Sequence, residues 1–325
     1  MTYNCLLKFI IIKIMKKIGL VILFLILFLK MQGQSVSFYE KNDESFADVK
    51  ISENLIFTCR VGGLKNNGET VVLLHGFPET SHMWKGLIKL LSQNGFNVIA
   101  PDQRGYSSGA RPKRIEDYKI GMLSKDVIDI VNAFGSEKFH LVGHDWGAAV
   151  GWALSAFHRD KIISYTALSV PHLDSFGNAI KNDKVQKKKS YYMDLFKIQY
   201  LPEFYFKIFN YRYLRKLWTS SNQNEIDSYI EVFSQDNALK SALNWYRATN
   251  LEGSRQIGDI FVPTLMIYGT NDMAIGIQGV DETEKYMKSF YSLKKINASH
   301  WLIQDSFDFV SNEILNHLKK FKFIK

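Results

Sequence analysis

The chain has 325 residues, of which 46% are hydrophobic and 14% aromatic, so it can bury a sizeable core and is not expected to be disordered. Its formal net charge of +9 includes five lysines and no acid in residues 1–33, which leaves +4 for the remainder. A charge of that size does not call for a nucleic-acid partner. A basic run at 184–189, KVQKKK, is interpreted as a solvated surface.

The N-terminal segment has the pattern of an export signal. An unbroken apolar run of 12 residues, Ile18–Leu29, follows two lysines and is too short to span a bilayer comfortably. Small residues near Gly33 predict cleavage there, so that residues 1–33 are a signal peptide and the mature protein is periplasmic or secreted. An uncleaved membrane anchor is the alternative. A complete signal pattern also begins at Met15, which suggests that residues 1–14 are an upstream start-site extension.

From about residue 46, short strand-like runs alternate with longer segments that have helical spacing. The predicted strands are 55–61, 70–74, 97–100, 139–142, 162–170 and 262–268. The predicted helices are 83–94, 121–134, 147–158 and 307–321. This alternation predicts an α/β fold with a mostly parallel sheet that is covered by helices on both faces.

The alternation is interrupted once, between about His172 and Gly258. This span is rich in tyrosine, phenylalanine and lysine, has helical periodicity and shows no strand pattern. We therefore expect a helical cap inserted into the sheet. The predicted organisation is a first core part at 34–171, the cap at 172–258 and a second core part at 259–325.

Two segments have the spacing Gly-x-x-x-Gly, which can carry a nucleophile on a sharp turn between a strand and a helix. In GHDWG, Asp145 follows the strand-like FHLV and precedes a helical run that opens with two alanines. In GYSSG, Ser107 is followed by ARPKR, where Pro112 and three basic residues indicate a loop. Ser107 is thus interpreted as a turn residue. The predicted nucleophile is Asp145.

A carboxylate nucleophile predicts displacement of a leaving group from an sp³ carbon, with an alkyl ester on the protein as the product. Hydrolysis of that ester needs a base, and the base needs an acid that orients it. Asp272 follows the predicted strand 262–268, and His300 follows the final strand. The backbone N–H groups of Phe77 and Trp146 are expected to form an oxyanion hole. No step calls for a cofactor or a metal ion.

The segments HGFPE, DQRGYS, GHDWGA, GTND and SHW together resemble the α/β-hydrolase superfamily, and specifically its epoxide hydrolase branch. The resemblance covers essentially the whole chain after about residue 46. It implies Asp145 as nucleophile, His300 as base and Asp272 as its acid partner. It also implies two cap tyrosines that hold and protonate the epoxide oxygen, and the matching positions are Tyr192 and Tyr246. A positioned phenol can donate its proton to the alkoxide that ring opening creates.

The expected partners are water and a small apolar epoxide or related small molecule, which would be opened to a vicinal diol, with a membrane needed only for export. Haloalkane dehalogenase is the main alternative, because its nucleophile turn also carries Asp-Trp-Gly. His144, the HGFP segment and the tyrosine pair favour the epoxide. A non-catalytic ligand binder of the same fold is a second alternative, against which the complete triad argues. Tyr246 lies on a clear amphipathic pattern, whereas Tyr191 competes with Tyr192 for the second position.

Overall fold

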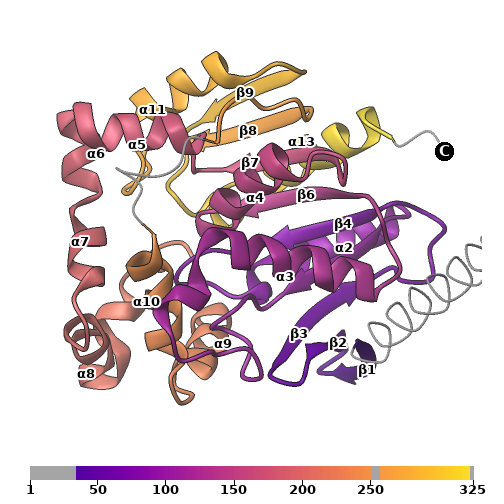
Figure 1. Ribbon diagram of the computed structural model, residues 1–325, viewed down its shortest axis with the longest axis horizontal. Helices are drawn as coiled ribbons and strands as arrows, with labels where there is room; N and C mark the ends of the chain where they lie inside the picture. The colour runs from indigo at the N-terminus through magenta and orange to yellow at the C-terminus, as the bar shows by residue number, and fades with distance from the viewer. Residues whose placement is uncertain (1–33, 250–256, 323–325) are drawn as a thin grey trace, which may run out of the picture.

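A computed structural model of the chain describes residues 34–249 and 257–322 (Figure 1). The predicted signal peptide therefore lies outside the described residues. Within these two ranges, no helix is long and apolar enough to cross a membrane. The strands are β1 (Ser35–Lys41), β2 (Glu44–Ser52), β3 (Leu55–Gly62), β4 (Thr70–Leu74), β5 (Asn97–Pro101), β6 (Phe139–His144), β7 (Ile162–Leu168), β8 (Thr264–Gly269) and β9 (Tyr291–Ile296).

The nine strands of the described residues form one sheet in the order β1-β2-β3-β5-β4-β6-β7-β8-β9. The six strands from β5 to β9 in this order pair in parallel, and the three at the N-terminal edge pair antiparallel. The central strands β4 and β6 are buried along their whole length, as expected for a parallel sheet covered on both faces. The predicted α/β-hydrolase fold with a mostly parallel sheet is confirmed.

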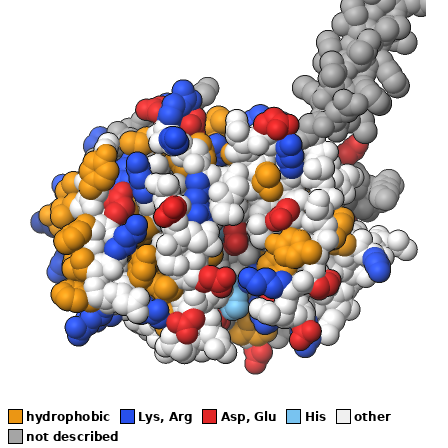
Figure 2. Space-filling view, turned by 90° about the horizontal axis from the view of Figure 1, so that it is seen from below, with side chains coloured by type: hydrophobic (Ala, Val, Ile, Leu, Met, Phe, Trp, Pro, Cys, Tyr) orange, Lys and Arg blue, Asp and Glu red, His pale blue; other side chains and the backbone are white. Residues whose placement is uncertain are grey.

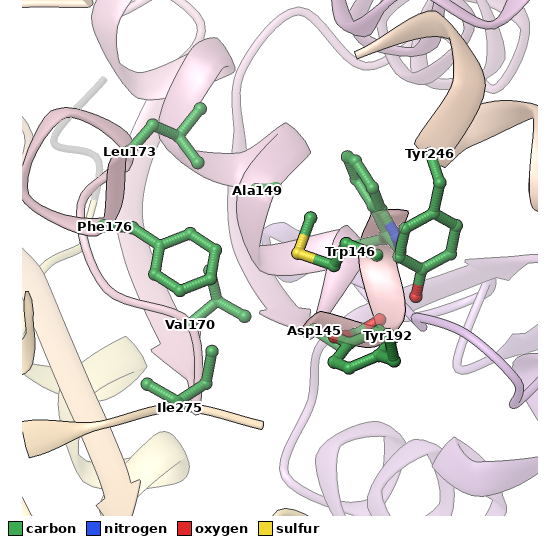
Figure 3. A pocket seen from close by; sticks show the side chains of 10 residues that line it. Asp145, Trp146, Ala149, Val170, Leu173, Phe176, Tyr192, Tyr246 and Ile275 are labelled. Carbon is green, nitrogen blue, oxygen red and sulfur yellow. The ribbon is translucent and has the colours of Figure 1, made fainter. Parts of the chain in front are cut away.

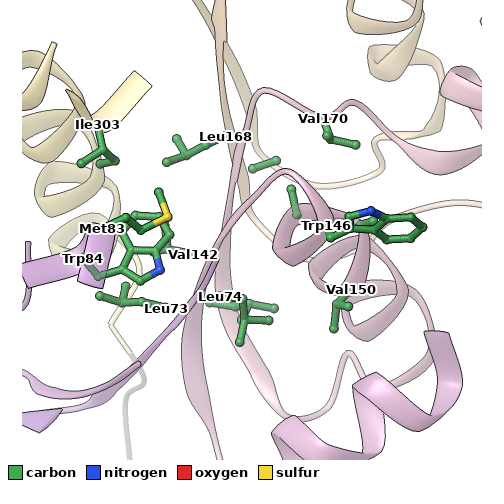
Figure 4. Close-up of a cluster of buried hydrophobic side chains, with 14 of the residues drawn as sticks. Leu73, Leu74, Met83, Trp84, Val142, Trp146, Val150, Leu168, Val170 and Ile303 are labelled. Atoms are coloured by element: carbon green, nitrogen blue, oxygen red, sulfur yellow. The ribbon is translucent and has the colours of Figure 1, made fainter. Parts of the chain in front are cut away.

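Helices pack on both faces of this sheet. Those of the core are α2 (Lys85–Gln93), α3 (Ile120–Ala133), α4 (Trp146–Phe157), α11 (Ile277–Glu282), α12 (Leu302–Asp305) and α13 (Phe307–Lys320), with 3₁₀ turns η1 (Ser81–Trp84), η2 (Ile115–Tyr118) and η3 (Thr283–Tyr286). Figure 1 shows α3 and α4 on the near face and α2 on the far face. Figure 4 shows the apolar side chains that fill the space between the sheet and these helices, among them Leu74, Val142 and Val150.

Every predicted strand and helix named above is present, with its ends within two residues of the prediction. The sequence did not predict β1 and β2. They form a hairpin whose two-residue loop, Asn42 and Asp43, has φ values of 52° and 61°. These left-handed conformations match the turn that two-residue hairpins favour. Because most β1 side chains are exposed, the strand lacks the apolar run by which the others were recognised.

Between β7 and β8, in the span predicted to be a cap, the elements of the described chain are all helices. These are α5 (Leu173–Asn182), α6 (Lys184–Lys189), α7 (Tyr191–Lys197), α8 (Leu201–Arg215), α9 (Gln223–Phe233) and α10 (Ala238–Ala248). In Figure 1 they lie beyond the carboxyl ends of the parallel strands. This is the edge of the sheet at which open α/β folds place their binding sites.

Candidate active site

Asp145 lies on a sharp turn between β6 and α4. Its backbone has φ 51° and ψ −120°, a combination that L residues rarely adopt and that is associated with functional sites. The two glycines near it, Gly143 and Gly147, leave no room for a side chain. A Cβ atom on Gly143 would lie 2.4 Å from the carbonyl oxygen of Gly147, and one on Gly147 would lie 2.1 Å from that of Leu74. The predicted strand–turn–helix context of Asp145 is therefore present.

The two oxygens of the Asp145 carboxylate have different surroundings. The backbone N–H of Phe77 donates to Oδ1 at 2.8 Å, whereas Oδ2 lies 3.6 Å from Nε2 of His300. Gly76 permits this approach, because a Cβ atom there would lie 2.3 Å from Oδ1. Trp146 is the first residue of α4, so its N–H has no carbonyl partner within the helix. The predicted donor of Phe77 is thus in contact with the carboxylate, and the N–H of Trp146 follows Asp145 directly in the chain.

His300 connects Asp145 to Asp272. Its Nδ1 lies 2.8 Å from Oδ2 of Asp272, and all three side chains are buried. Oδ1 of Asp272 accepts hydrogen bonds from the backbone N–H groups of Ala274 and Ile275, at 2.7 and 2.9 Å. Burial raises the pKa of Asp272, but the neighbouring His300 and these hydrogen bonds outweigh it and lower that pKa. Asp272 is therefore ionised and able to stabilise a protonated imidazole.

The pKa of His300 is raised to about 10. Burial alone lowers it, but the negative charge of Asp272 and the contacts with the carboxylates of Asp145 and Asp272 have the larger effect. Part of this increase depends on the charge of Asp145. Loss of that charge would make the imidazole release its proton more easily.

A second buried network contacts the backbone of His300, and it was not predicted from the sequence. The carboxylate of Glu79, in the HGFPE segment, lies 3.0 Å from Nδ1 of His144 and accepts hydrogen bonds from Tyr229 and Gln304. Nε2 of His144 lies 2.9 Å from the backbone carbonyl of His300. Because that carbonyl accepts a hydrogen bond, Nε2 of His144 carries the proton. The network thus fixes the backbone of the predicted base.

Tyr192 on α7 and Tyr246 on α10 extend over Asp145 from the cap. Both line a cavity of about 160 Å³ that also contains Asp145, His300 and Phe77. Figure 3 shows a smaller adjoining cavity, in which the Tyr246 ring points toward Asp145 and Tyr192 and apolar side chains lie opposite. Burial, followed by neighbouring groups that include Asp145, raises the pKa of both phenols. Each hydroxyl therefore keeps its proton at neutral pH.

The structure also separates the competing residues. Tyr191 is 64% exposed, so its neighbour Tyr192 is the one that faces the cavity. Ser107 lies in the loop after β5, where its hydroxyl donates to the carbonyl of Asp102 at 2.5 Å and accepts from the N–H of Thr58 at 3.0 Å. The ring of His75 accepts from the N–H of Gln103, which leaves it no free nitrogen acceptor. Neither Ser107 nor His75 reaches the cavity.

Comparisons with known proteins agree with this arrangement. Residues 69–306, well over half the chain, match the α/β hydrolase fold family. Epoxide hydrolase 3 of Xenopus tropicalis is 31% identical over 264 residues, which cover 77% of this chain and 71% of the relative. The AB hydrolase superfamily protein YfhM of Bacillus subtilis is 34% identical over 263 residues, which cover 78% of this chain and 92% of the relative. The crystal structure of an epoxide hydrolase from Bacillus megaterium with an inhibitor superimposes with a TM-score of 0.75 at 25% identity, covering 87% of this chain and 100% of that one.

The match over residues 69–306 is extensive enough to assign the chain to a protein family. The chain belongs to the α/β-hydrolase family. Within that family it belongs to the epoxide hydrolase branch, as the sequence motifs predicted.

Proposed function

We propose that this protein hydrolyses epoxides to vicinal diols through an ester between the substrate and Asp145. The observation that carries the proposal is the placement of two buried tyrosines, Tyr192 and Tyr246, over the same cavity as Asp145. A ring-opening reaction needs proton donors opposite its nucleophile, whereas a leaving halide needs no proton. Relatives named as epoxide hydrolases support the same assignment.

In the first step, Oδ2 of Asp145 attacks one carbon of the epoxide ring. The new carbon–oxygen bond forms as the ring bond breaks, and the alkoxide takes a proton from Tyr192 or Tyr246. Oδ1 stays on the N–H of Phe77 and becomes the carbonyl oxygen of the ester. The product of this step is a covalent hydroxyalkyl ester of the protein.

In the second step, His300 takes a proton from water, and the resulting hydroxide attacks the carbonyl carbon of the ester. The N–H groups of Phe77 and Trp146 stabilise the tetrahedral oxyanion, and Asp272 stabilises the imidazolium. Collapse breaks the bond between this carbon and the substrate oxygen, which takes the proton of the added hydroxyl, so that the diol is released and the carboxylate restored. His300 thus ends the cycle protonated, as it began. The sum is one epoxide and one water converted to one diol.

Ester formation itself prepares the second step. The carboxylate of Asp145 is one of the two negative groups that raise the pKa of His300. Esterification removes that charge, so the imidazole releases its proton more readily once the intermediate exists. That proton passes to the tyrosinate left by ring opening, which restores the phenol and leaves His300 neutral, able to accept a proton from water.

The test compares tyrosine variants on two substrates, styrene oxide and 1-bromobutane. Tyr246→Phe should slow epoxide opening by about ten- to a hundredfold, and the Tyr192→Phe/Tyr246→Phe double variant should nearly stop it. Tyr191→Phe, which changes the exposed neighbour, is the matched control and should keep the full rate. Full epoxide turnover in the double variant, or turnover of the bromoalkane alone, would refute the assignment.

We also propose that the mature protein is exported. The support is the apolar run Ile18–Leu29 with its preceding lysines and following small residues. Expression from Met15 should place the protein outside the cytoplasm with an N-terminus near Gln34. N-terminal sequencing of a membrane-bound product that retains residues 15–33 would establish an uncleaved anchor instead.

A further inference from the structure

The outer side of the cap exposes an unusual number of large apolar side chains. Tyr200 is 69% exposed, Phe204 67% and Phe209 71%. Nine exposed large hydrophobic residues fall within 25 positions of the chain: Val185, Tyr191, Leu195, Ile198, Tyr200, Leu201, Phe204, Tyr205 and Phe209. Soluble monomers rarely expose apolar side chains in such a concentration, and where they do, the surface is commonly an interaction site.

Helices α7 and α8 are apolar on both sides. On the inner side, Phe196 and Phe206 pack against Phe77 above the cavity, with ring centroids 5.6 and 6.2 Å from it. On the outer side of α7, the exposed residues Tyr191, Leu195 and Ile198 recur at the spacing of one helical face. Apolar side chains that cluster on the exposed side of a helix are commonly covered by a partner or by lipid. The inner side is explained by the cavity, and the outer side needs a partner.

The same segment carries the positive charge of the molecule. Residues 184–216, from the start of α6 to just past the end of α8, contain nine lysines and arginines and two acids, a net charge of +7. The chain from residue 34 onward carries +4, so the rest of it is negative by three charges. Figure 2 shows orange side chains gathered at the left of the molecule, the side on which α6–α8 lie in Figure 1, with blue side chains among them.

We propose that this outer cap face, the exposed side of residues 184–216, binds the surface of an anionic lipid bilayer. Aromatic and aliphatic side chains enter the boundary between headgroups and acyl chains, while the surrounding lysines pair with the negative headgroups. A second copy of the chain is a poorer partner, because it would bring together two segments that each carry a net charge of +7. The sequence had indicated a membrane for export only, and this inference adds a contact of the folded protein.

The inference does not depend on the proposed catalytic activity, but the two would act together. Helix α7 presents Leu195 to the outside and Phe196 to the cavity. A membrane on the outer cap face would therefore be separated from the cavity by the thickness of one helix. An apolar substrate dissolved in the bilayer would be concentrated next to the site.

Hydrogen–deuterium exchange of the full chain, with and without vesicles, tests the proposal. Vesicles with about 30% phosphatidylglycerol in phosphatidylcholine should slow exchange in peptides that cover residues 191–209 by about tenfold. Pure phosphatidylcholine vesicles should protect them less. The local measurement keeps the signal separate from any binding by residues 1–33, which are the same in every sample.

Two matched aromatic triple variants and one lysine triple variant identify the residues that make the contact. Tyr200→Ser/Phe204→Ser/Phe209→Ser should abolish the vesicle-dependent protection, whereas Phe38→Ser/Phe157→Ser/Phe261→Ser, which removes exposed aromatics from the core, should retain it. Lys184→Gln/Lys187→Gln/Lys188→Gln should weaken protection by the anionic vesicles. Both aromatic variants are first checked for an unchanged thermal unfolding transition and unchanged epoxide turnover.

Other outcomes would overturn the proposal. One is the absence of protection in residues 191–209 at vesicle concentrations that sediment the protein. A second is protection that the cap variant retains. A third is protection that needs no vesicles and increases with protein concentration, which would assign the outer cap face to a second copy of the chain.

Discussion

Nε2 of His300 lies 3.6 Å from Oδ2 of Asp145, while the other nitrogen of the same ring lies 2.8 Å from Asp272. The imidazole is thus held firmly on one side and only loosely on the other. The firm contact orients the base, and the looser one leaves it beside the carbonyl carbon that an Asp145 ester would present to water.

The first prediction concerns pH and stability. The pKa of His300 is about 10 in the folded protein and about 6.5 in an unfolded chain. Its protonated form therefore stabilises the fold fully below pH 6.5, and this contribution is lost as the pH rises toward 10. The difference in the free energy of unfolding between wild type and His300→Gln should be largest near pH 6 and should shrink toward pH 10.

Urea unfolding at several pH values between these limits measures that difference. Asp272→Asn removes the carboxylate whose charge raises the pKa of His300 most, and it should flatten the pH dependence in a similar way. A difference between wild type and His300→Gln that stays constant with pH would show that His300 is not stabilised in its protonated form.

The second prediction concerns the serine of the other Gly-x-x-x-Gly segment. Ser107→Ala removes a buried hydroxyl that joins the carbonyl of Asp102 to the N–H of Thr58. It should lower the free energy of unfolding by about 1–3 kcal/mol and leave epoxide turnover of the folded protein within about twofold. Ser108→Ala, at the exposed neighbouring position, is the control and should change neither quantity. A thousandfold loss of turnover in folded Ser107→Ala would show that Ser107, and not Asp145, is the nucleophile.

The third prediction concerns the network behind the base. Glu79→Gln keeps the shape of a fully buried side chain but removes the carboxylate that meets His144, Tyr229 and Gln304. We expect thermal unfolding to show a stability loss of about 1–3 kcal/mol, because a hydrogen-bonded buried acceptor is lost. Glu284→Gln, on an exposed turn, should have little effect. Equal stability of the two variants would show that Glu79 does not stabilise the structure around the site.

The predictable and unpredictable parts of the site differ in the range of the interactions that define them. The position of Asp145 follows from its immediate neighbours, because the strand before it, the two glycines and the alanine-rich helix after it are all local. The network around Glu79 is long-range, since its partner Gln304 is 225 residues away in sequence. A single sequence gives no sign of that contact.

The cap shows the same distinction. Its helical periodicity was recognised, yet the choice between Tyr191 and Tyr192 depends on which way α7 is rotated over the cavity. That rotation is set by packing of Phe196 against Phe77 and Phe206, which belong to other elements. The basic run at 184–189 was correctly expected to be largely exposed, but the apolar face beside it becomes visible only once α7 and α8 are placed.

The covalent intermediate is the central claim, and mass spectrometry of His300→Gln tests it most directly. This variant keeps Asp145, Tyr192 and Tyr246 for ring opening but lacks the base for hydrolysis. After incubation with styrene oxide, its intact mass should increase by that of one substrate molecule, and the Asp145→Asn/His300→Gln double variant should show no increase. Absence of the adduct while the wild type turns the epoxide over, or its persistence in the double variant, would contradict the account.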